Sequence, residues 1–226
     1  ALQDGEKRVA PETDRTQTPI DVTVYLDYSC IHCEDFEKTN STVIDNWAGS
    51  GDAQFEFYPV PFQDTAGNNR HSTRAANLMA CVVNEDPADG VAMKLHSALY
   101  EPDTYQKGVS QGLSDEDLYQ LAENAGADVT NEVKQCVKNV TFGEFIAQNA
   151  QAASTDGILG LAKGQTLSDG QGGQQEAGGP QKLRGTPLVI VNGVEWQSQT
   201  GDFSDFEQHL LKVKSELEQQ NSSEED

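Results

Sequence analysis

The sequence is short of positive charge, and this shortage limits the partners that it can bind. Its 15 lysine and arginine residues stand against 37 aspartate and glutamate residues, so the formal net charge at pH 7 is −22. Nucleic acids and anionic membrane surfaces both bind through clusters of basic side chains. The composition therefore excludes nucleic acid as a partner and indicates an acidic, well-solvated surface.

Long apolar runs and large numbers of cysteines are also lacking. No apolar stretch approaches the roughly 20 residues that a helix needs to span a membrane. Four cysteines in 226 residues are too few for a small fold held together mainly by disulfides. The length instead fits one large domain, or one domain that carries a second one as an insertion.

Residues 1–19 are polar, charged and proline-containing, and we expect them to form a flexible leader. A stalk of this kind remains when a preceding signal or membrane anchor has been removed. Whether such an anchor precedes Ala1 stays open at this point.

The next part of the chain, residues 20–65, is predicted to form a β-α-β unit. The apolar run 21–28 predicts a buried strand, residues 34–46 predict a helix, and residues 55–60 predict a second strand that ends at prolines. The side chains expected on the buried face of the helix are Phe36, Thr39, Val43 and Trp47. Such a unit implies a right-handed crossover between parallel strands.

Residues 66–153 show no strand pattern and are predicted to form an all-helical insertion. Its helices are expected at residues 70–84, 88–99, 115–125 and 132 to about 153. Ser114, with an acidic residue three positions later, predicts a capping box at the start of one of them. The histidines of the predicted helices are expected at the surface or half-buried: His71, His96 and His209.

The last part, residues 154–220, is predicted to return to the first domain. Residues 157–185 are dense in glycine, glutamine and serine and predict a long flexible loop or a substrate-facing flap. The apolar runs 188–191 and 194–196 are joined by Asn-Gly, which is the strongest short signal for a β-hairpin.

The C-terminal region is predicted to close the fold with one helix over residues 203–219. Its apolar face consists of Phe206, Leu210, Val213 and Leu217. The acidic residues 221–226 are expected to form a frayed tail.

The strongest chemical signal is the motif Cys30-Ile31-His32-Cys33, which stands where the first strand meets the first helix. Two thiols at this spacing suit the making and breaking of a disulfide within one turn. At a helix start, Cys30 gains thiolate stabilisation from unpaired amides and the helix dipole, and His32 adds a positive charge or a hydrogen bond. The alternative is half of a zinc site, but no second pair of ligands at short spacing completes one, so no metal is expected.

Two motifs together resemble a known family. Residues 27–33, Asp-Tyr-Ser-Cys-Ile-His-Cys, and residues 184–193, Arg-Gly-Thr-Pro-Leu-Val-Ile-Val-Asn-Gly, closely resemble the DsbA-like thiol–disulfide oxidoreductases. The resemblance extends over about residues 21–217. It implies an α/β thioredoxin fold with an inserted all-helical domain, in agreement with the predicted order of elements. Ile31 stands where family members often have proline.

The resemblance also implies roles for individual residues. Cys30 is the exposed nucleophile that forms a mixed disulfide with substrate, and Cys33 is the more buried thiol that resolves it. Pro187 follows a cis peptide bond beside the dithiol, so that the backbone of Thr186 can pair with an extended substrate. Asp27 is a candidate for proton transfer when Cys33 deprotonates.

The activity implied is that of an extracytoplasmic enzyme, without a cofactor, that introduces disulfide bonds into reduced or unfolded exported proteins. A membrane quinone-linked partner would restore its disulfide. Two alternatives stay open: a disulfide reductase or isomerase, and a redox-inert domain that binds unfolded peptides.

The two remaining cysteines, Cys81 and Cys136, lie on separate predicted helices of the insertion. In an extracytoplasmic protein we expect them to form a structural disulfide. The alternative is a pair of buried free thiols that act as small apolar side chains.

Overall fold

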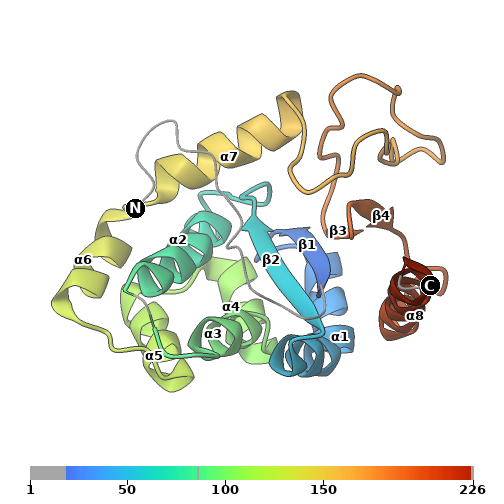
Figure 1. Ribbon diagram of the computed structural model, residues 1–226. Helices are drawn as coiled ribbons and strands as arrows, with labels where there is room; N and C mark the ends of the chain where they lie inside the picture. Colours follow the sequence, from blue (N-terminus) through green and yellow to red (C-terminus); the bar gives the residue numbers. More distant parts are fainter. Residues whose placement is uncertain (1–18, 86, 225–226) are drawn as a thin grey trace.

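A computed structural model describes residues 19–85 and 87–224, so the predicted leader lies outside the described residues except for Pro19. The described part of the chain contains one four-stranded sheet (Figure 1). Its strands are β1 (Ile20–Leu26), β2 (Ala53–Pro59), β3 (Leu188–Val191) and β4 (Val194–Trp196). No helix in these residues is long and apolar enough to cross a membrane.

The sheet has the order β2-β1-β3-β4 and mixes two directions of pairing. Strand β1 is parallel to β2 and antiparallel to β3, and β3 pairs with β4 as a hairpin. The predicted β-α-β unit and the predicted hairpin are therefore confirmed. With β1 in the centre and buried on both faces, its apolar run needs no polar alternation.

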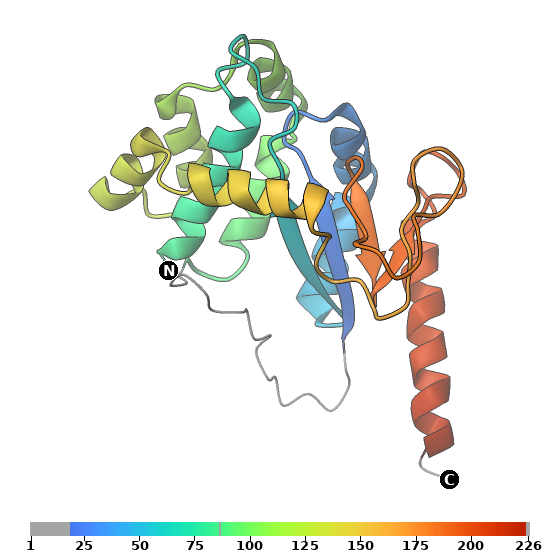
Figure 2. The same cartoon turned by 90° about the horizontal axis from the view of Figure 1, so that it is seen from above.

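Helices cover both faces of the sheet. Helices α1 (Ile31–Ser50) and α8 (Phe206–Glu224) pack on one face, and α7 (Gly143–Thr155) crosses the other (Figure 2). Because successive side chains of a strand point to opposite faces, Val24 packs in the same core as α1 and α8, whereas Tyr25 packs with α7.

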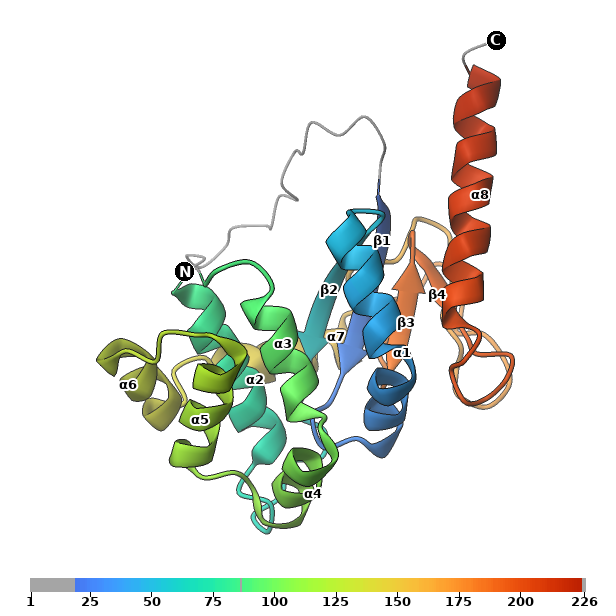
Figure 3. The same ribbon diagram turned by 90° about the horizontal axis from the view of Figure 1, so that it is seen from below.

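The remaining helices follow β2 and precede α7 in the sequence, and they form a separate group beside the sheet. They are α2 (His71–Asn84), α3 (Val91–Leu99), α4 (Pro102–Gln111), α5 (Asp115–Ala125) and α6 (Asn131–Asn139). Figure 3 shows α3 of this group lying beside α1. We call α2 to α7 the helical insertion. The capping box predicted at Ser114 is present, because Ser114 and Asp117 bond each other's backbone N–H groups.

Helix α4 is not predicted from the sequence, and α6 and α7 are two helices where the sequence predicts one. Helix α4 is polar and starts with Pro102 in its first turn, and it buries little besides Tyr105 and Gly108. Helices α6 and α7 are separate because Val140 adopts the left-handed conformation, with φ of 49°. A β-branched residue is disfavoured there, so local sequence gave no warning of the break.

Several predicted positions also need correction. Helix α1 begins at Ile31 rather than at residue 34, and Thr39 is exposed instead of facing the core. The residues predicted as a frayed tail continue the backbone of α8 as far as Glu224. His71 and His96 are fully buried rather than at the surface, whereas His209 is half-buried as expected.

The glycine-rich segment 157–185 forms no helix or named strand, as predicted, but it is tied to the sheet. The phenol of Tyr25 accepts a hydrogen bond from the Leu159 N–H at 2.7 Å, and Ala162 N–H donates to the Gly193 carbonyl at 2.8 Å. A Cβ atom at Gly193 would lie 2.5 Å from that of Ala162. The close approach therefore requires glycine in the hairpin turn.

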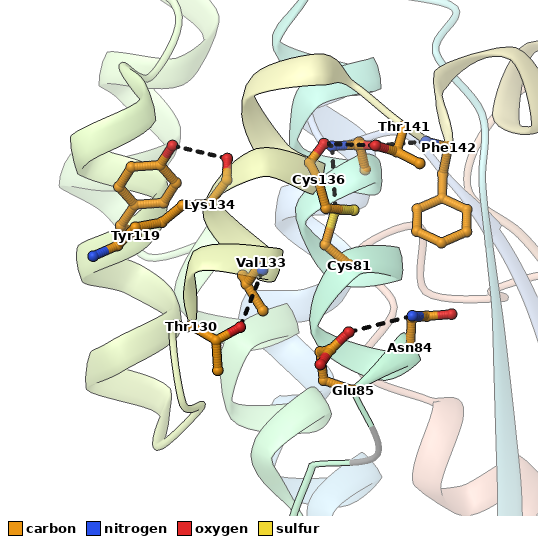
Figure 4. Close-up of a disulfide and its surroundings, with 11 residues drawn as sticks. Cys81, Asn84, Glu85, Tyr119, Thr130, Val133, Lys134, Cys136, Thr141 and Phe142 are labelled. Atoms are coloured by element: carbon orange, nitrogen blue, oxygen red, sulfur yellow. Dashed lines mark hydrogen bonds between the residues drawn. A yellow bond between two sulfur atoms is a disulfide. The ribbon is translucent and has the colours of Figure 1, made fainter.

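Cys81 of α2 and Cys136 of α6 are joined by a disulfide in this structure, with an S–S distance of 2.01 Å (Figure 4). Asn77, one turn before Cys81, donates a hydrogen bond to the Cys136 carbonyl and accepts one from the Phe142 N–H. The disulfide and these bonds fasten α6 and the start of α7 to α2.

Replacing both Cys81 and Cys136 by alanine should lower the free energy of unfolding by about 4 kcal/mol, measured by denaturant titration. The reason is that the bond spans a sequence separation of 55 and removes the entropy of that loop from the unfolded chain. Alkylation without prior reduction, followed by mass spectrometry, should label neither sulfur atom. Label on both would contradict the bond, and the reduced chain serves as the control.

Candidate active site

The dithiol lies at the N-terminus of α1. Cys30 is the N-cap residue, with extended backbone angles, and its carbonyl accepts hydrogen bonds from the N–H groups of Cys33 and Glu34. Both cysteines are free thiols in this structure, with 6% of Cys30 and 2% of Cys33 exposed. The expectation of an exposed Cys30 is therefore wrong, although Cys33 is the more buried of the two. Within the described residues, no group of three or more His, Cys, Asp or Glu side chains could hold a metal ion.

The pairing of β1 with β3 brings the two sequence motifs together. Because the strands are antiparallel and Tyr25 pairs with Leu188, the segment that follows β1 lies beside the segment that precedes β3. The Thr186–Pro187 peptide bond is cis. The Cys30 thiol donates a hydrogen bond to the Thr186 carbonyl at 3.4 Å, across a sequence separation of 156 residues.

The surroundings of Cys30 favour its thiolate. A hydrogen bond from the Cys33 thiol is the largest influence, and together with the side chain of Thr186 and the N–H groups of Cys33 and His32 it outweighs the opposing effect of burial. The pKa of Cys30 is thereby lowered from its ordinary value of 9.0 to about 5. Cys30 is thus ionised at neutral pH, as the reactive form of a thiol must be.

The surroundings of Cys33 have the opposite effect. Burial, followed by the hydrogen bond that Cys33 gives to Cys30 and the charge of Cys30, raises the pKa of Cys33 well above 9.0. The backbone N–H of Asp27 donates to the Cys33 sulfur atom at 3.4 Å. The two thiols of one motif therefore differ in charge, and only Cys30 is equipped as a nucleophile.

Asp27 is fully buried at the end of β1. Its carboxylate accepts hydrogen bonds from the Ser29 N–H at 2.8 Å, the Gln63 N–H at 2.8 Å and the Ser72 hydroxyl at 2.5 Å. Burial nevertheless dominates and raises the pKa of Asp27 from 3.8 to about 6. The contact that the structure records with Cys33 runs through the main chain of Asp27, not through its carboxylate.

His32 is exposed on the first turn of α1. Its backbone N–H helps to lower the pKa of Cys30, whereas no hydrogen bond of its imidazole is recorded among the described residues. A role for the ring therefore stays a prediction.

A groove of about 350 Å³ runs beside Pro187 at the end of the β3–β4 hairpin. Trp196 and Phe203 supply aromatic surface, and Glu195 and Ser168 line it with polar groups. Ser168 comes from the glycine-rich segment and donates its N–H to the Glu195 carboxylate at 2.6 Å. The segment predicted as a flap thus forms part of the groove wall.

The helical insertion contributes two site residues that the sequence does not predict, Tyr100 and Tyr105. The phenol of Tyr100 donates to the Asp27 carbonyl at 3.1 Å, and that of Tyr105 donates to the Ser29 carbonyl at 3.2 Å. Nothing in the local sequence marks these tyrosines, since they act on a loop more than 70 residues away. They hold the turn that leads into the dithiol.

Comparisons with known proteins bear on the family of the chain and on the fold that carries this site. The sequence model of the thioredoxin family matches residues 15–160, and no curated protein sequence matches significantly. Among solved structures, reduced DsbG, a disulfide bond oxidoreductase of Mycobacterium tuberculosis, has a TM-score of 0.63 at 22% identity, over 86% of this chain and 77% of that one.

Two further solved structures are similar. Reduced DsbA from Mycobacterium tuberculosis gives a TM-score of 0.61 at 22% identity, over 85% of this chain and 81% of that one. MdbA, a thiol-disulfide oxidoreductase from Corynebacterium diphtheriae, gives 0.62 at 19% identity, over 87% and 85%. The chain belongs to the thioredoxin family. Its fold, together with the Cys30–Cys33 dithiol, is that of the DsbA-like thiol–disulfide oxidoreductases, as the two motifs predict.

Reduced wild-type protein should gain stability over a Cys30→Ser variant as the pH rises. The folded pKa of about 5 lies below that of the unfolded thiol, so the gain is absent below pH 5 and complete above about pH 9. It should reach about 3 kcal/mol at pH 7 and about 5 kcal/mol at the upper limit, at 1.36 kcal/mol per pKa unit. Denaturant unfolding of both reduced proteins at several pH values measures it, and a difference that is independent of pH would contradict the lowered pKa.

Proposed function

We propose that the protein is an extracytoplasmic disulfide oxidase that introduces disulfide bonds into reduced or unfolded exported proteins. The unequal environments of Cys30 and Cys33 carry this proposal. They favour the reduced state with an ionised Cys30, and stabilisation of the reduced state makes the disulfide state the stronger oxidant. A pKa lowered from 9.0 to about 5 corresponds to about 5 kcal/mol of preference for the thiolate.

The reaction begins from the Cys30–Cys33 disulfide. A substrate thiolate attacks the Cys30 sulfur atom, which forms a mixed disulfide and releases Cys33 as a thiolate that takes up a proton. A second substrate thiolate then attacks the substrate sulfur atom that is bonded to Cys30. This forms the substrate disulfide and expels Cys30 as a thiolate. The substrate loses two electrons to the dithiol, and Cys30 leaves readily because its pKa is low.

Thr186 and Pro187 are the proposed substrate-binding residues. The Thr186 carbonyl lies at the Cys30 sulfur atom, so a peptide whose cysteine reaches Cys30 passes next to this backbone. An extended segment can pair with such an edge by strand addition. The aromatic groove beside Pro187 would receive side chains that flank the substrate cysteine.

The cycle requires a second partner that takes two electrons from the reduced dithiol. We assign this role to a membrane quinone-linked protein, by analogy with the family, and place the reaction in the cell envelope or a periplasm-like space. Attack of the Cys30 thiolate on the partner's disulfide gives a mixed disulfide and releases one partner thiolate. Cys33, once deprotonated, attacks the Cys30 sulfur atom, expels the second partner thiolate and restores the internal disulfide, so that the partner gains two electrons.

Oxidative refolding of a reduced, unfolded protein tests the proposed function. A stoichiometric excess of the oxidised wild-type chain should restore activity of the test protein, because each Cys30–Cys33 disulfide takes up two electrons, whereas Cys30→Ala should lose this activity. The equilibrium constant with glutathione separates an oxidase from a reductase, because an oxidase takes electrons from reduced glutathione. Unchanged activity in Cys30→Ala would exclude dithiol chemistry and favour the peptide-binding alternative.

Asp27 is proposed as the group that accepts the Cys33 proton during reoxidation. Resolution of a mixed disulfide between Cys30 and glutathione by Cys33 should then accelerate as the pH rises through about 6, where the carboxylate ionises. Asp27→Asn should slow this step about 100-fold, the lower end of what general bases contribute, and remove the inflection. Stopped samples analysed by mass spectrometry give the rate.

Ser72→Ala is the matched control for Asp27, since it removes a hydrogen bond that lowers the pKa of this carboxyl group. It should move the inflection to higher pH while the step still depends on Asp27. An inflection that persists in Asp27→Asn would assign it to another group.

A further inference from the structure

One side chain of the helical insertion, His96, bonds to residues on both sides of the Cys30–Cys33 motif. On one flank, Tyr28 lies two residues before Cys30. On the other, Glu37 lies four residues after Cys33, one helical turn further along α1. His96 of α3 bonds to both: its Nδ1 atom lies 3.1 Å from the Tyr28 hydroxyl, and its Nε2 atom lies 3.2 Å from the Glu37 carboxylate.

The three side chains form a buried hydrogen-bonded chain in which His96 lies between Tyr28 and Glu37. Tyr28, Glu37 and His96 are all buried, with only 1% of His96 exposed. Ser97 donates a further hydrogen bond to the Glu37 carboxylate at 2.8 Å. The imidazole stacks on the ring of Phe57 at 4.2 Å and meets the edge of Tyr100 at 5.5 Å. His96 is therefore fixed in position by packing as well as by its two polar partners.

The chemistry of the partners determines what the ring donates. Burial alone would raise the pKa of Glu37, but the hydrogen bonds and charge supplied by His96 and the Ser97 hydroxyl lower it, so Glu37 is an ionised acceptor. Burial raises the pKa of Tyr28 well above 10.0, so its hydroxyl keeps its proton. The ring must then carry a proton on Nε2, and in its neutral form Nδ1 accepts from Tyr28.

The chain of hydrogen bonds through His96 spans the segment that stabilises the Cys30 thiolate. The N–H groups of His32 and Cys33, which stabilise the thiolate, lie in the segment between Tyr28 and Glu37. The residues next to Tyr28 are held from the same insertion, Asp27 by Tyr100 and Ser29 by Tyr105. Three consecutive residues before the dithiol are thus fixed by α3 and α4.

We propose that His96 is a positioning residue for the dithiol: by bonding Tyr28 and Glu37 it holds the turn so that the backbone N–H groups of α1 face the Cys30 sulfur atom. The helical insertion thereby sets the redox potential of the Cys30–Cys33 pair. This inference deepens the proposed thiol–disulfide activity and rests on it.

Three variants separate the two bonds of His96. His96→Leu removes both hydrogen bonds and keeps an apolar side chain of similar size. His96→Gln keeps an N–H donor at the place of Nε2, toward Glu37, and Tyr28→Phe removes only the hydroxyl on the other flank. Leu118→Ala is the control, because Leu118 is fully buried in α5 of the insertion and its side chain forms none of the hydrogen bonds described above.

Each variant is tested for the pKa of Cys30, from the ultraviolet absorbance of the thiolate, and for the equilibrium constant with glutathione. His96→Leu should raise the pKa by about one unit and make the pair less oxidising by about tenfold in that constant, or about 30 mV. Tyr28→Phe should shift both in the same direction by less, and His96→Gln should restore part of the loss. Leu118→Ala should lower the unfolding midpoint and leave both quantities unchanged.

A His96→Leu protein that is destabilised like Leu118→Ala, with an unchanged pKa and equilibrium constant, would reduce His96 to a packing role and overturn the inference. If His96→Leu does not fold, unshifted values in both Tyr28→Phe and His96→Gln overturn it equally. A wild-type chain without measurable exchange with glutathione would instead overturn the proposed function.

Discussion

A negative charge on a nearly buried sulfur atom is the condition on which the site depends. Cys30 is almost inaccessible to water, so the protein must supply the stabilisation that solvent would give. It does so with N–H groups at the start of α1, the Cys33 thiol and the side chain of Thr186. Other parts of the fold position these donors. The sheet positions α1, and the pairing of β1 with β3 positions Thr186.

The two parts of the chain divide this task. The sheet brings residues 30 and 186 together, because antiparallel neighbours align the end of one strand with the start of the other. The helical insertion then fixes the turn in detail through Tyr100, Tyr105 and His96. Its internal disulfide, far from the dithiol in sequence, keeps α2 and α6 together. One pair of sulfur atoms is thus structural, while the other is kept available for exchange.

Local sequence was enough to predict the strands, the hairpin, the capping box at Ser114 and the dithiol, because each of these depends on neighbouring residues. It was not enough where distant contacts decide. Helix α4 buries only Tyr105 and Gly108, and Val140 adopts a left-handed conformation that a β-branched residue disfavours. His96 resembles a surface histidine until Glu37 and Tyr28, 59 and 68 residues away, are seen to bond to it. Tyr100 and Tyr105 are likewise unmarked in the sequence, because the carbonyl groups that they bond lie more than 70 residues away.

The place of Cys30 as the N-cap of α1 has one more consequence. N-cap positions favour Ser, Thr, Asp or Asn, whose oxygen atoms accept the first free N–H groups of the helix, and no such side-chain cap is present here. An anionic sulfur atom can take that role, whereas a sulfur atom locked in a bond with Cys33 carries no charge to offer. The thiolate therefore offers the first N–H groups of α1 an anionic acceptor that the disulfide lacks, so the charge that reduction places on Cys30 falls at a helix end that favours it.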